Sequence, residues 1–293
     1  MALIPEQIST LNLIETTQLP EKEDVLMFLE EVEKIIKEKS DDDNQRGYLG
    51  MSGIGDPCER KLWYGFHMVS KKEPHIERTK RIFNTGHIAE GFIYKDLKKI
   101  GYDVFGAQES CVGVAGHFSG HIDGKVSGVI EAPKTIHLLE MKTMNDKNFK
   151  EIVKTQSVQK SKPVHYAQMQ CYMHYQNLTR ALYIAYNKNT SEYYIERVYY
   201  DKDFALDIIS KATKIIMSEK PPLKEFAPTW YACKFCDHRG VCHDGEKPAI
   251  NCRTCIEADI CDGGKWECGL DSKELSVDDQ KCGCEYHKLG WGL

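Results

Sequence analysis

The sequence lacks several features that would place it in common protein classes. No apolar run in its 293 residues is long enough to cross a bilayer, and the N-terminal MALIPEQIST has neither the basic nor the apolar block of a signal peptide. A phosphate-binding Gly-Lys-Ser/Thr loop is missing, which excludes the usual helicase motif. The net charge of -5 gives no global sign of nucleic-acid binding, although it allows a local basic channel. We therefore expect a soluble, cytoplasmic protein without membrane contact.

Cysteine is abundant, with 12 residues, and a cytosolic protein rarely keeps so many without a metal. Cys233, Cys236 and Cys242 form a C-x-x-C-x5-C group after Trp230. Three closely spaced thiolates need a fourth ligand from elsewhere, and Cys58 is available at a turn early in the chain. Four thiolates suit either an iron–sulfur cluster or zinc, so this spacing does not fix the metal.

A second cysteine group follows Pro248 and contains seven candidate ligands: Cys252, Cys255, Cys261, Cys268, Cys282, Cys284 and His287. A tetrahedral zinc site needs four, and the spacing favours Cys252, Cys255, Cys268 and Cys284, with His287 as the close competitor. A disulfide scaffold is the alternative, and a reducing cytosol disfavours it. Such a small segment cannot build a large core, so metal would supply much of its folding free energy, and it would bind DNA or a partner protein.

The stretch from Ser119 to Thr143 carries a possible catalytic pattern. It predicts two strands joined by a turn, with Asp123 in the first strand and Glu140 and Lys142 on one face of the second. Two carboxylates and a lysine are what a magnesium-dependent phosphodiesterase needs, because hard oxygen ligands hold the ion and an ammonium orients water or offsets charge. The alternative is a solvated strand face with a surface ion pair.

Helix patterns flank this stretch. Residues 76–100 predict a long helix broken by Gly86, with Ile82, Ile88, Phe92, Ile93 and Leu97 on its apolar face and with Glu90 four residues after Gly86. Residues 165–175 predict a second helix on which Gln168 and Tyr172 share a face. A hairpin turning at residues 187–191 and a closing helix over 201–219 follow. Residues 21–39 predict an amphipathic helix near the N-terminus.

Lysines gather in the segment after Lys142, and these are Lys147, Lys150, Lys154, Lys160 and Lys162. Such a patch binds a sugar-phosphate backbone through counterion release, although a solvated helix face would look the same. Its position next to the catalytic pattern favours the first interpretation.

Taken together, these motifs resemble the PD-(D/E)XK nuclease superfamily in its RecB-type branch, over about residues 47–243. Asp123 and Glu140-Met141-Lys142 match the acid and E-x-K of that core, Gln168 and Tyr172 match Q-x-x-x-Y, and Glu90 stands four residues after Gly86 where a His or Glu reaches the metal. His87 is the near alternative. Cys58 with the three later cysteines resembles the iron–sulfur cluster of AddB and CRISPR-associated nucleases. The C-terminal segment looks most like nucleases of tailed bacteriophages.

The resemblance implies an α/β fold with a mixed central sheet flanked by helices, closed by a four-cysteine cluster. It implies three regions: an N-terminal helical extension over 1–46, the nuclease domain over 47–245 and a zinc module over 246–293. Glu90, Asp123 and Glu140 would bind magnesium or manganese, Lys142 would position water, and Gln168 and Tyr172 would steady the DNA strand. Cys58, Cys233, Cys236 and Cys242 would hold a 4Fe-4S cluster with a structural role.

The activity implied is metal-dependent DNA cleavage, as an exonuclease rather than an endonuclease, in phage replication, recombination or repair. The substrate would be single-stranded DNA or duplex ends, and a phage annealing protein, a helicase or a second copy of the chain are possible partners. Two alternatives from other classes stay open: a non-catalytic DNA-binding recombination scaffold and an iron–sulfur redox sensor.

Overall fold

The computed structural model describes residues 30–32, 34–35, 46–71 and 77–291. The chain divides into two compact units, residues 1–43 with 75–81 and residues 44–74 with 82–293. In the smaller unit residues 30–32 and 34–35 are helical, and the rest of the predicted extension over 1–46, up to Gln45, lies outside the described residues. Within the described ranges, no helix combines the length and apolarity needed to cross a lipid bilayer.

The larger unit is built around a mixed five-stranded sheet in the order β2-β5-β6-β7-β8. The strands are β2 (Asp103–Phe105), β5 (Gly124–Ser127), β6 (His137–Met144), β7 (Arg180–Asn187) and β8 (Tyr193–Tyr199). Only β6 and β7 run parallel, and the other neighbours are antiparallel. A parallel pair needs a long crossover, and the helices between β6 and β7 supply it.

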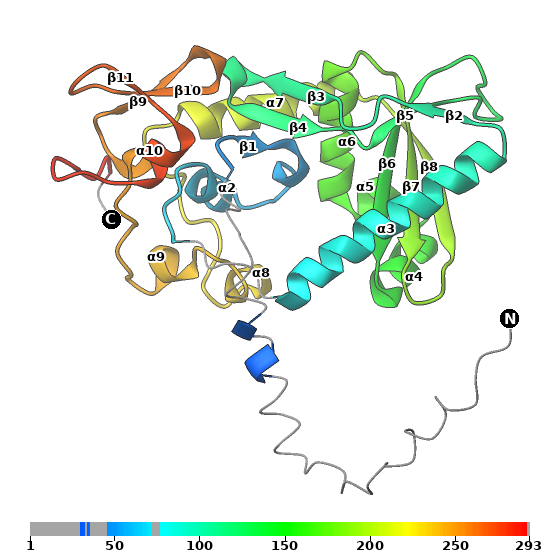
Figure 1. The fold of residues 1–293 in the computed structure, drawn as a ribbon, viewed down its shortest axis with the longest axis horizontal. Coiled ribbons are helices and arrows are strands. Elements are labelled where there is room, and N and C mark those ends of the chain that lie inside the picture. The colour runs from blue at the N-terminus through cyan, green and yellow to red at the C-terminus, as the bar shows by residue number, and fades with distance from the viewer. Residues whose placement is uncertain (1–29, 33, 36–45, 72–76, 292–293) are drawn as a thin grey trace, which may run out of the picture. The chain divides into compact units, whose positions relative to one another are not determined.

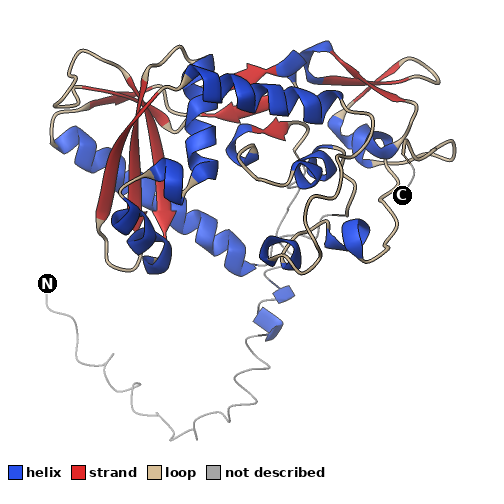
Figure 2. Ribbon diagram, turned by 180° about the vertical axis from the view of Figure 1, so that it is seen from behind, coloured by secondary structure: helices blue, strands red, loops and turns tan. Residues whose placement is uncertain are grey.

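Helices cover both faces of this sheet. On one face, Ile93 and Leu97 of α3 (Glu77–Lys99) pack against Leu139, Met141 and Leu182. The opposite face, which carries Leu138 and Tyr183, packs against the crossover helices α4 (Asp146–Thr155), α5 (Val158–Ser161) and α6 (Pro163–Tyr175). Figure 1 shows α3 in front of the strands, and Figure 2, from behind, shows α4 and α5 in front of them. Because strand side chains alternate, Glu140 and Lys142 belong to the face of α4–α6.

A second sheet of three strands has the order β1-β4-β3. Its strands are β1 (Leu49–Gly50), β3 (Ser110–Gly113) and β4 (Phe118–His121), with the short helices η2 (Met51–Gly53) and η3 (Val114–Gly116) beside them. Helix α2 (Glu59–Phe66) follows η2 and places Trp63, Tyr64 and Phe66 in the main core. Helix α7 (Lys202–Met217) completes this region, and Lys211 Nζ donates hydrogen bonds to the backbone oxygens of Ile54 and Asp56.

The C-terminal residues form short elements. These are α8 (Tyr231–Lys234), α9 (Arg239–His243), η4 (Cys252–Thr254), β9 (Ala258–Cys261), η5 (Asp262–Gly264), β10 (Lys265–Cys268), β11 (Lys273–Leu275) and α10 (Val277–Lys281). Strands β9–β11 make an antiparallel sheet in the order β11-β10-β9. Residues 246–291 belong to the same compact unit as residues 46–71 and 82–245, so the segment predicted as a zinc module packs on the rest.

A close backbone approach helps to hold the C-terminal sheet in place. Gly116 has a φ of +88°, and a Cβ there would lie 2.3 Å from the backbone nitrogen of Gly264. Beside it, His117 Nε2 lies 2.8 Å from the carbonyl oxygen of Cys261. Only glycine combines this φ with this approach, so the contact between η3 and η5 depends on a residue without a side chain.

Two predictions about the elements were wrong. The first strand predicted in residues 119–143 is two strands, because β4 pairs in the three-stranded sheet and β5 pairs in the five-stranded sheet. Asp123 therefore lies in the link between two sheets, outside both strands. Helix α3 is not broken at Gly86: a Cβ there would be 3.5 Å from Thr143 Oγ1, an ordinary contact, so the helix passes over the end of β6 without strain.

The predicted apolar face of α3 was right only in part. Ile93 and Leu97 are buried, whereas Ile82, Ile88 and Phe92 are exposed. Helix positions four apart share a face, so Ala89, Ile93 and Leu97 form the buried stripe, and Ile88 and Phe92 lie one position away from it. The helices over residues 165–175 and 201–219 and the hairpin turning at residues 187–191 are confirmed, within a few residues.

Candidate functional site

Glu140 is the most unusual residue of the central sheet. Its side chain is 0% exposed, and neither carboxylate oxygen has a hydrogen-bond partner among the described residues. Burial raises the pKa of Glu140 to about 7, the ammonium of Lys142 opposes this rise, and the carboxylates of Asp123 and Glu90 add to it. A buried carboxylate without hydrogen bonds is costly, and such groups concentrate at functional sites.

Lys142 lies next to Glu140 on the same face of β6. Its Nζ is 2.5 Å from Glu140 Oε1, a close ion pair without hydrogen-bond alignment, and its side chain is 25% exposed. Burial lowers the pKa of the Lys142 ammonium, but the carboxylates of Glu140, Asp123 and Glu90 outweigh that effect and raise it. Lys142 therefore stays charged, with one side against buried carboxylate and the other accessible to solvent.

Asp123 reaches this site from the link between the two sheets. Its Oδ2 accepts a hydrogen bond of 2.7 Å from the backbone N–H of Met141. Strand β5 begins only at Gly124, so no β5 backbone group is available opposite Met141, and the carboxylate takes that place. The backbone oxygen of Asp123 accepts a hydrogen bond from the hydroxyl of Tyr94 on α3. Asp123 is thus held by β6 through Met141 and by α3 through Tyr94.

Glu90 approaches from α3, one turn before Tyr94. Burial raises the pKa of Glu90, Asp123 raises it further, and His87 and Lys142 lower it, so its carboxylate lies in the field of the other site residues. His87 Nδ1 is 3.8 Å from Glu90 Oε1. The His87 side chain is 74% exposed against 31% for Glu90, which favours Glu90 over His87 as the residue facing the site.

The structure therefore brings Glu90, Asp123, Glu140 and Lys142 close enough for their charges to affect one another's pKa values. In the described part of the chain, no three His, Cys, Asp or Glu side chains surround one point closely enough to hold a metal ion. The donor set nevertheless fits a hard divalent cation, because all three acids offer oxygen and the two oxygens of Glu140 accept no hydrogen bond from the described residues. Here the ammonium of Lys142 provides the positive charge next to Glu140.

Gln168 and Tyr172 lie behind this group rather than at the surface. Gln168 is 4% exposed and Tyr172 2% exposed. The Gln168 amide neighbours the Tyr172 phenol, and burial and then Glu140 raise the pKa of that phenol. A Cβ on Gly120 would lie 2.6 Å from the Tyr172 hydroxyl, so this ring packs on the β4 backbone. With this burial, we expect both residues to support the carboxylates, without touching a strand of DNA.

Sequence reasoning missed His165 and Tyr183. Tyr183 is the direct register partner of Glu140 across β6 and β7, and its hydroxyl is 2.8 Å from His165 Nδ1. Burial lowers the pKa of His165 to about 3, and the charges of Lys142 and Lys162 add to this, so the ring is neutral. The signal was available, because His165 is three residues before Gln168 on the same helix and thus next to it on one face.

The five lysines after Lys142 lie on the crossover helices and around them. Lys147, Lys150, Lys154 and Lys160 are exposed, and Lys162 is half-buried. Two of them have acidic partners, since Lys150 pairs with Asp146 at 2.7 Å and Lys162 with Glu151 at 2.5 Å. Helix α4 begins four residues after Lys142, so the lysines of this helix follow the site directly in the chain.

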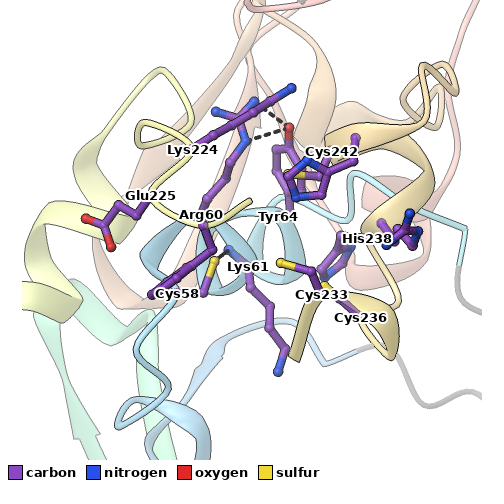
Figure 3. A pocket seen from close by; sticks show the side chains of 13 residues that line it. Cys58, Arg60, Lys61, Tyr64, Lys224, Glu225, Cys233, Cys236, His238 and Cys242 are labelled. Atoms are coloured by element: carbon purple, nitrogen blue, oxygen red, sulfur yellow. Dashed lines mark hydrogen bonds between the residues drawn. The ribbon is translucent and has the colours of Figure 1, made fainter. Parts of the chain in front are cut away.

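Cys58, Cys233, Cys236 and Cys242 line one pocket, with Arg60, Lys61 and Tyr64 among its other lining residues (Figure 3). Cys58 caps the N-terminus of α2, and its Sγ accepts a hydrogen bond of 3.4 Å from Lys61 N–H. Burial raises the pKa of Cys233, and the neighbouring Cys58, Cys236 and Cys242 raise it further. Two distant parts of the chain thus bring the four predicted thiols together. None of the twelve cysteines, which all lie in described residues, forms a disulfide.

Arg60 has a structural position at this pocket. Its guanidinium donates to the Tyr64 hydroxyl at 2.6 and 3.0 Å (Figure 3). It also donates to the backbone oxygen of Pro222 at 2.6 Å. Trp63, on the same helix as Arg60, donates a hydrogen bond of 2.8 Å from its Nε1 to the backbone oxygen of Ser218. These bonds tie α2 to the segment that leads to Cys233, so Arg60 supports the cysteine region.

The cysteines and the histidine predicted to bind zinc lie near the C-terminus. Cys252, Cys255, Cys261, Cys268 and His287 are partly buried, and Cys282 and Cys284 are exposed. Burial raises the pKa of Cys252 to about 11, and the neighbouring thiols of Cys284, Cys255 and Cys268 raise it further. His287 instead lies 2.9 Å from the hydroxyl of Thr254 through its Nε2.

Comparison with known proteins gives limited likenesses. No protein-family model matches the chain, and no curated protein matches it. Among solved structures, the chain is similar to the alkaline exonuclease LHK-Exo from Laribacter hongkongensis, with 16% identity, a TM-score of 0.42 and coverage of 58% of this chain and 87% of that one. LHK-Exo in complex with dAMP gives 17% identity, a TM-score of 0.42 and coverage of 58% and 86%. SSO0001 gives 15% identity, a TM-score of 0.40 and coverage of 75% and 96%. Likenesses at this level carry no conclusion about activity, and the mixed α/β architecture and the site stand on the chain's own residues.

Proposed function

We propose that this chain is a magnesium- or manganese-dependent deoxyribonuclease that hydrolyses phosphodiester bonds. The observation that carries the proposal is the fully buried Glu140 carboxylate, unpartnered by hydrogen bonds and 2.5 Å from Lys142, in the field of Asp123 and Glu90. Burying a carboxylate in this way is unfavourable unless positive charge compensates it. The alternative interpretation, a solvated strand face with a surface ion pair, would leave Glu140 exposed to solvent, whereas its side chain is buried.

Glu90, Asp123 and Glu140 are the residues that would hold the ion. When bound, a divalent ion polarises the phosphate and lowers the pKa of a coordinated water. Asp123 is oriented for this role by the N–H of Met141, so it does not need to rearrange its backbone. Lys142, charged and partly accessible, orients the attacking water and offsets the charge that develops on the phosphate.

DNA is the proposed substrate, and exonucleolytic action is the mode that the family resemblance implies. The exposed lysines of α4 and its continuation, Lys147, Lys150, Lys154 and Lys160, support a path for a sugar-phosphate backbone beside the site. The proposal places the chain in phage DNA replication or recombination, where an annealing protein or helicase would supply the DNA end.

The four thiols of the Figure 3 pocket are proposed to hold a 4Fe-4S cluster, with zinc as the alternative metal. Arg60, Lys61, Lys224 and Arg239 also line the pocket, and their positive charge suits a site where thiolates accumulate negative charge. Its role would be structural, because it would join the start of α2 to the segment after α7.

The test is anaerobic purification with iron, sulfide and zinc analysis, followed by digestion of end-labelled single-stranded and duplex DNA with and without manganese. We expect metal-dependent release of nucleotides, lost in Asp123→Ala and Lys142→Ala with folding and metal–sulfur absorbance unchanged. Full activity in a clean Asp123→Ala preparation would contradict the assignment. DNA binding that is independent of the three carboxylates and without cleavage would favour the scaffold alternative.

A further inference from the structure

The segment 250–291 brings four separated cysteines together by its backbone. Cys252 and Cys255 lie at the two ends of one tight turn, in which Cys255 N–H donates to Cys252 O at 3.0 Å. Asn251 caps this turn, and its side chain accepts from Thr254 N–H at 3.1 Å. A C-x-x-C pair on such a turn is the usual half of a zinc site.

Two other parts of the chain meet this turn. Cys252 N–H donates to Cys282 O at 3.0 Å, which places the loop that contains Cys284 against it. Cys268 is the register partner of Ala258 across β10 and β9, and Ala258 N–H donates to Cys255 O at 3.3 Å. The second half of a four-thiol site therefore arrives from β10 and from the loop after α10.

We propose that Cys252, Cys255, Cys268 and Cys284 bind a zinc ion that fixes the C-terminal segment onto helix α2. The backbone contacts support it, since the turn of Cys252 and Cys255 meets both β10, which carries Cys268, and the loop that carries Cys284. Among the described residues no three such side chains surround one point, so zinc binding would have to draw the four thiols together. The segment buries few large apolar side chains, and a small segment of this kind is stabilised by metal.

The contacts of the remaining candidates separate them from this site. His287 Nε2 is engaged by Thr254 Oγ1 at 2.9 Å. Cys261 lies at the end of β9, where its carbonyl contacts His117 on the main core. The Cys282 carbonyl accepts from Cys252 N–H, and the spacing leaves the Cys282 thiol as an extra. The choice between Cys284 and His287, which spacing leaves open, falls on Cys284.

Arg253 shows what the zinc turn would control. It lies between Cys252 and Cys255 and is 2% exposed. Its guanidinium donates to Phe66 O and Gly47 O at 2.6 Å each and to Gln280 Oε1 at 2.6 and 2.9 Å. It also lies over the rings of Phe66 and Trp266 at 5.1 and 4.7 Å. Because the turn sets the place of Arg253, metal in the turn would hold the end of α2, the helix that begins after Cys58.

The test is thiol alkylation of the intact protein with and without zinc, read peptide by peptide by mass spectrometry. Cys282 and Cys284 are both exposed and two residues apart, so they are an internal matched pair. We expect zinc to protect Cys284 together with Cys252, Cys255 and Cys268, and to leave Cys282 reactive. Equal reactivity of Cys282 and Cys284 in zinc-loaded protein would overturn the proposal.

Zinc content provides the second measurement. Cys284→Ser should lose about one zinc ion per chain relative to wild type, whereas Cys282→Ser and His287→Asn should lose none. Cys236→Ser, which disrupts the other cysteine pocket, should keep this zinc. Equal zinc content in Cys284→Ser and Cys282→Ser would contradict the site. The alkylation test on wild-type protein decides the question even if Cys284→Ser fails to fold, and neither result bears on DNA cleavage.

Discussion

Asp123 Oδ2 accepts a hydrogen bond of 2.7 Å from the backbone N–H of Met141, the residue between Glu140 and Lys142. This single bond connects the link between two sheets with the centre of β6. It explains how an acid that belongs to neither sheet is held at the site, and it suggests a substitution that separates orientation from charge.

Asp123→Asn keeps an acceptor for Met141 N–H but loses the negative charge. We expect its fold and thermal stability to stay close to those of wild type and its metal-dependent cleavage rate to fall by about 10²-fold or more, because a neutral amide is a poor ligand for a hard ion. Steady-state digestion of end-labelled DNA checks this. Asp103→Asn, an exposed acid on β2, is the matched control and should cleave normally. Wild-type activity in Asp123→Asn would contradict the role of Asp123 as a metal ligand.

Glu140 predicts a specific pH dependence of metal binding. Its pKa is raised to about 7 by burial, so below pH 7 the carboxyl is protonated and must lose its proton before it can bind a cation. The apparent affinity for manganese should therefore fall by up to about tenfold for each pH unit below 7 and level off above it. Calorimetric titration of metal-free protein between pH 5.5 and 8.5 measures this. In Glu140→Gln we expect weak binding without the inflection near pH 7.

The pair of His165 and Tyr183 predicts a positioning effect on catalysis. The Tyr183 hydroxyl contacts His165 Nδ1 at 2.8 Å, and the ring borders Glu140. Tyr183→Phe and His165→Asn should lower kcat by about tenfold with little change in KM, because the pair acts through Glu140 and Lys142 and not by binding DNA.

The same helix offers a matched control for that prediction. His174 and Tyr200 form an equivalent contact of 2.8 Å between His174 Nδ1 and the Tyr200 hydroxyl, away from the carboxylates. His174→Asn and Tyr200→Phe should leave kcat unchanged. Equal losses in both pairs would mean that the first pair acts only through stability.

His67 predicts a loss of stability in acid. It is buried, stacked on Trp63 with ring centroids 3.8 Å apart, and its pKa is lowered to about 3, mainly by burial. The unfolded chain, with a histidine pKa near 6.5, binds the proton first, so stability falls as pH decreases from about 6.5 to about 3. Protonation linked to His67 should lower the free energy of unfolding by about 2 kcal/mol between pH 7 and pH 5.

Denaturant unfolding of wild type and His67→Gln at both pH values measures this contribution. The variant should be less stable at pH 7, because the ring packing is lost, but its stability should change less between pH 7 and pH 5. The difference between the two proteins cancels effects of other titrating groups and of the metal sites. An identical pH dependence in wild type and variant would show that His67 is accessible to protons in the folded state.

Local patterns were enough for part of the fold and of the site. The E-x-K spacing set Glu140 and Lys142 on one face because strand side chains alternate with a period of two. The capping turn at Cys58, the helix over residues 165–175 and the hairpin turning at residues 187–191 are likewise encoded within short windows. The grouping of Cys58 with Cys233, Cys236 and Cys242 could be predicted because three thiolates on a short segment leave one ligand missing.

The tertiary structure decided the features that depend on residues far apart in the chain. Whether Asp123 ends a strand or links two sheets depends on which strands pair, and pairing partners are distant in the chain. The burial of Glu140, Gln168 and Tyr172 follows from packing of α4–α6 on one face of β6, and for the last two it favours support of the carboxylates over contact with DNA. The place of Arg253 against α2 also depends on long-range contacts. The sequence by itself determined the chemistry that these residues can offer, and packing decided which of them are accessible, because burial is a property of the whole chain and not of any segment.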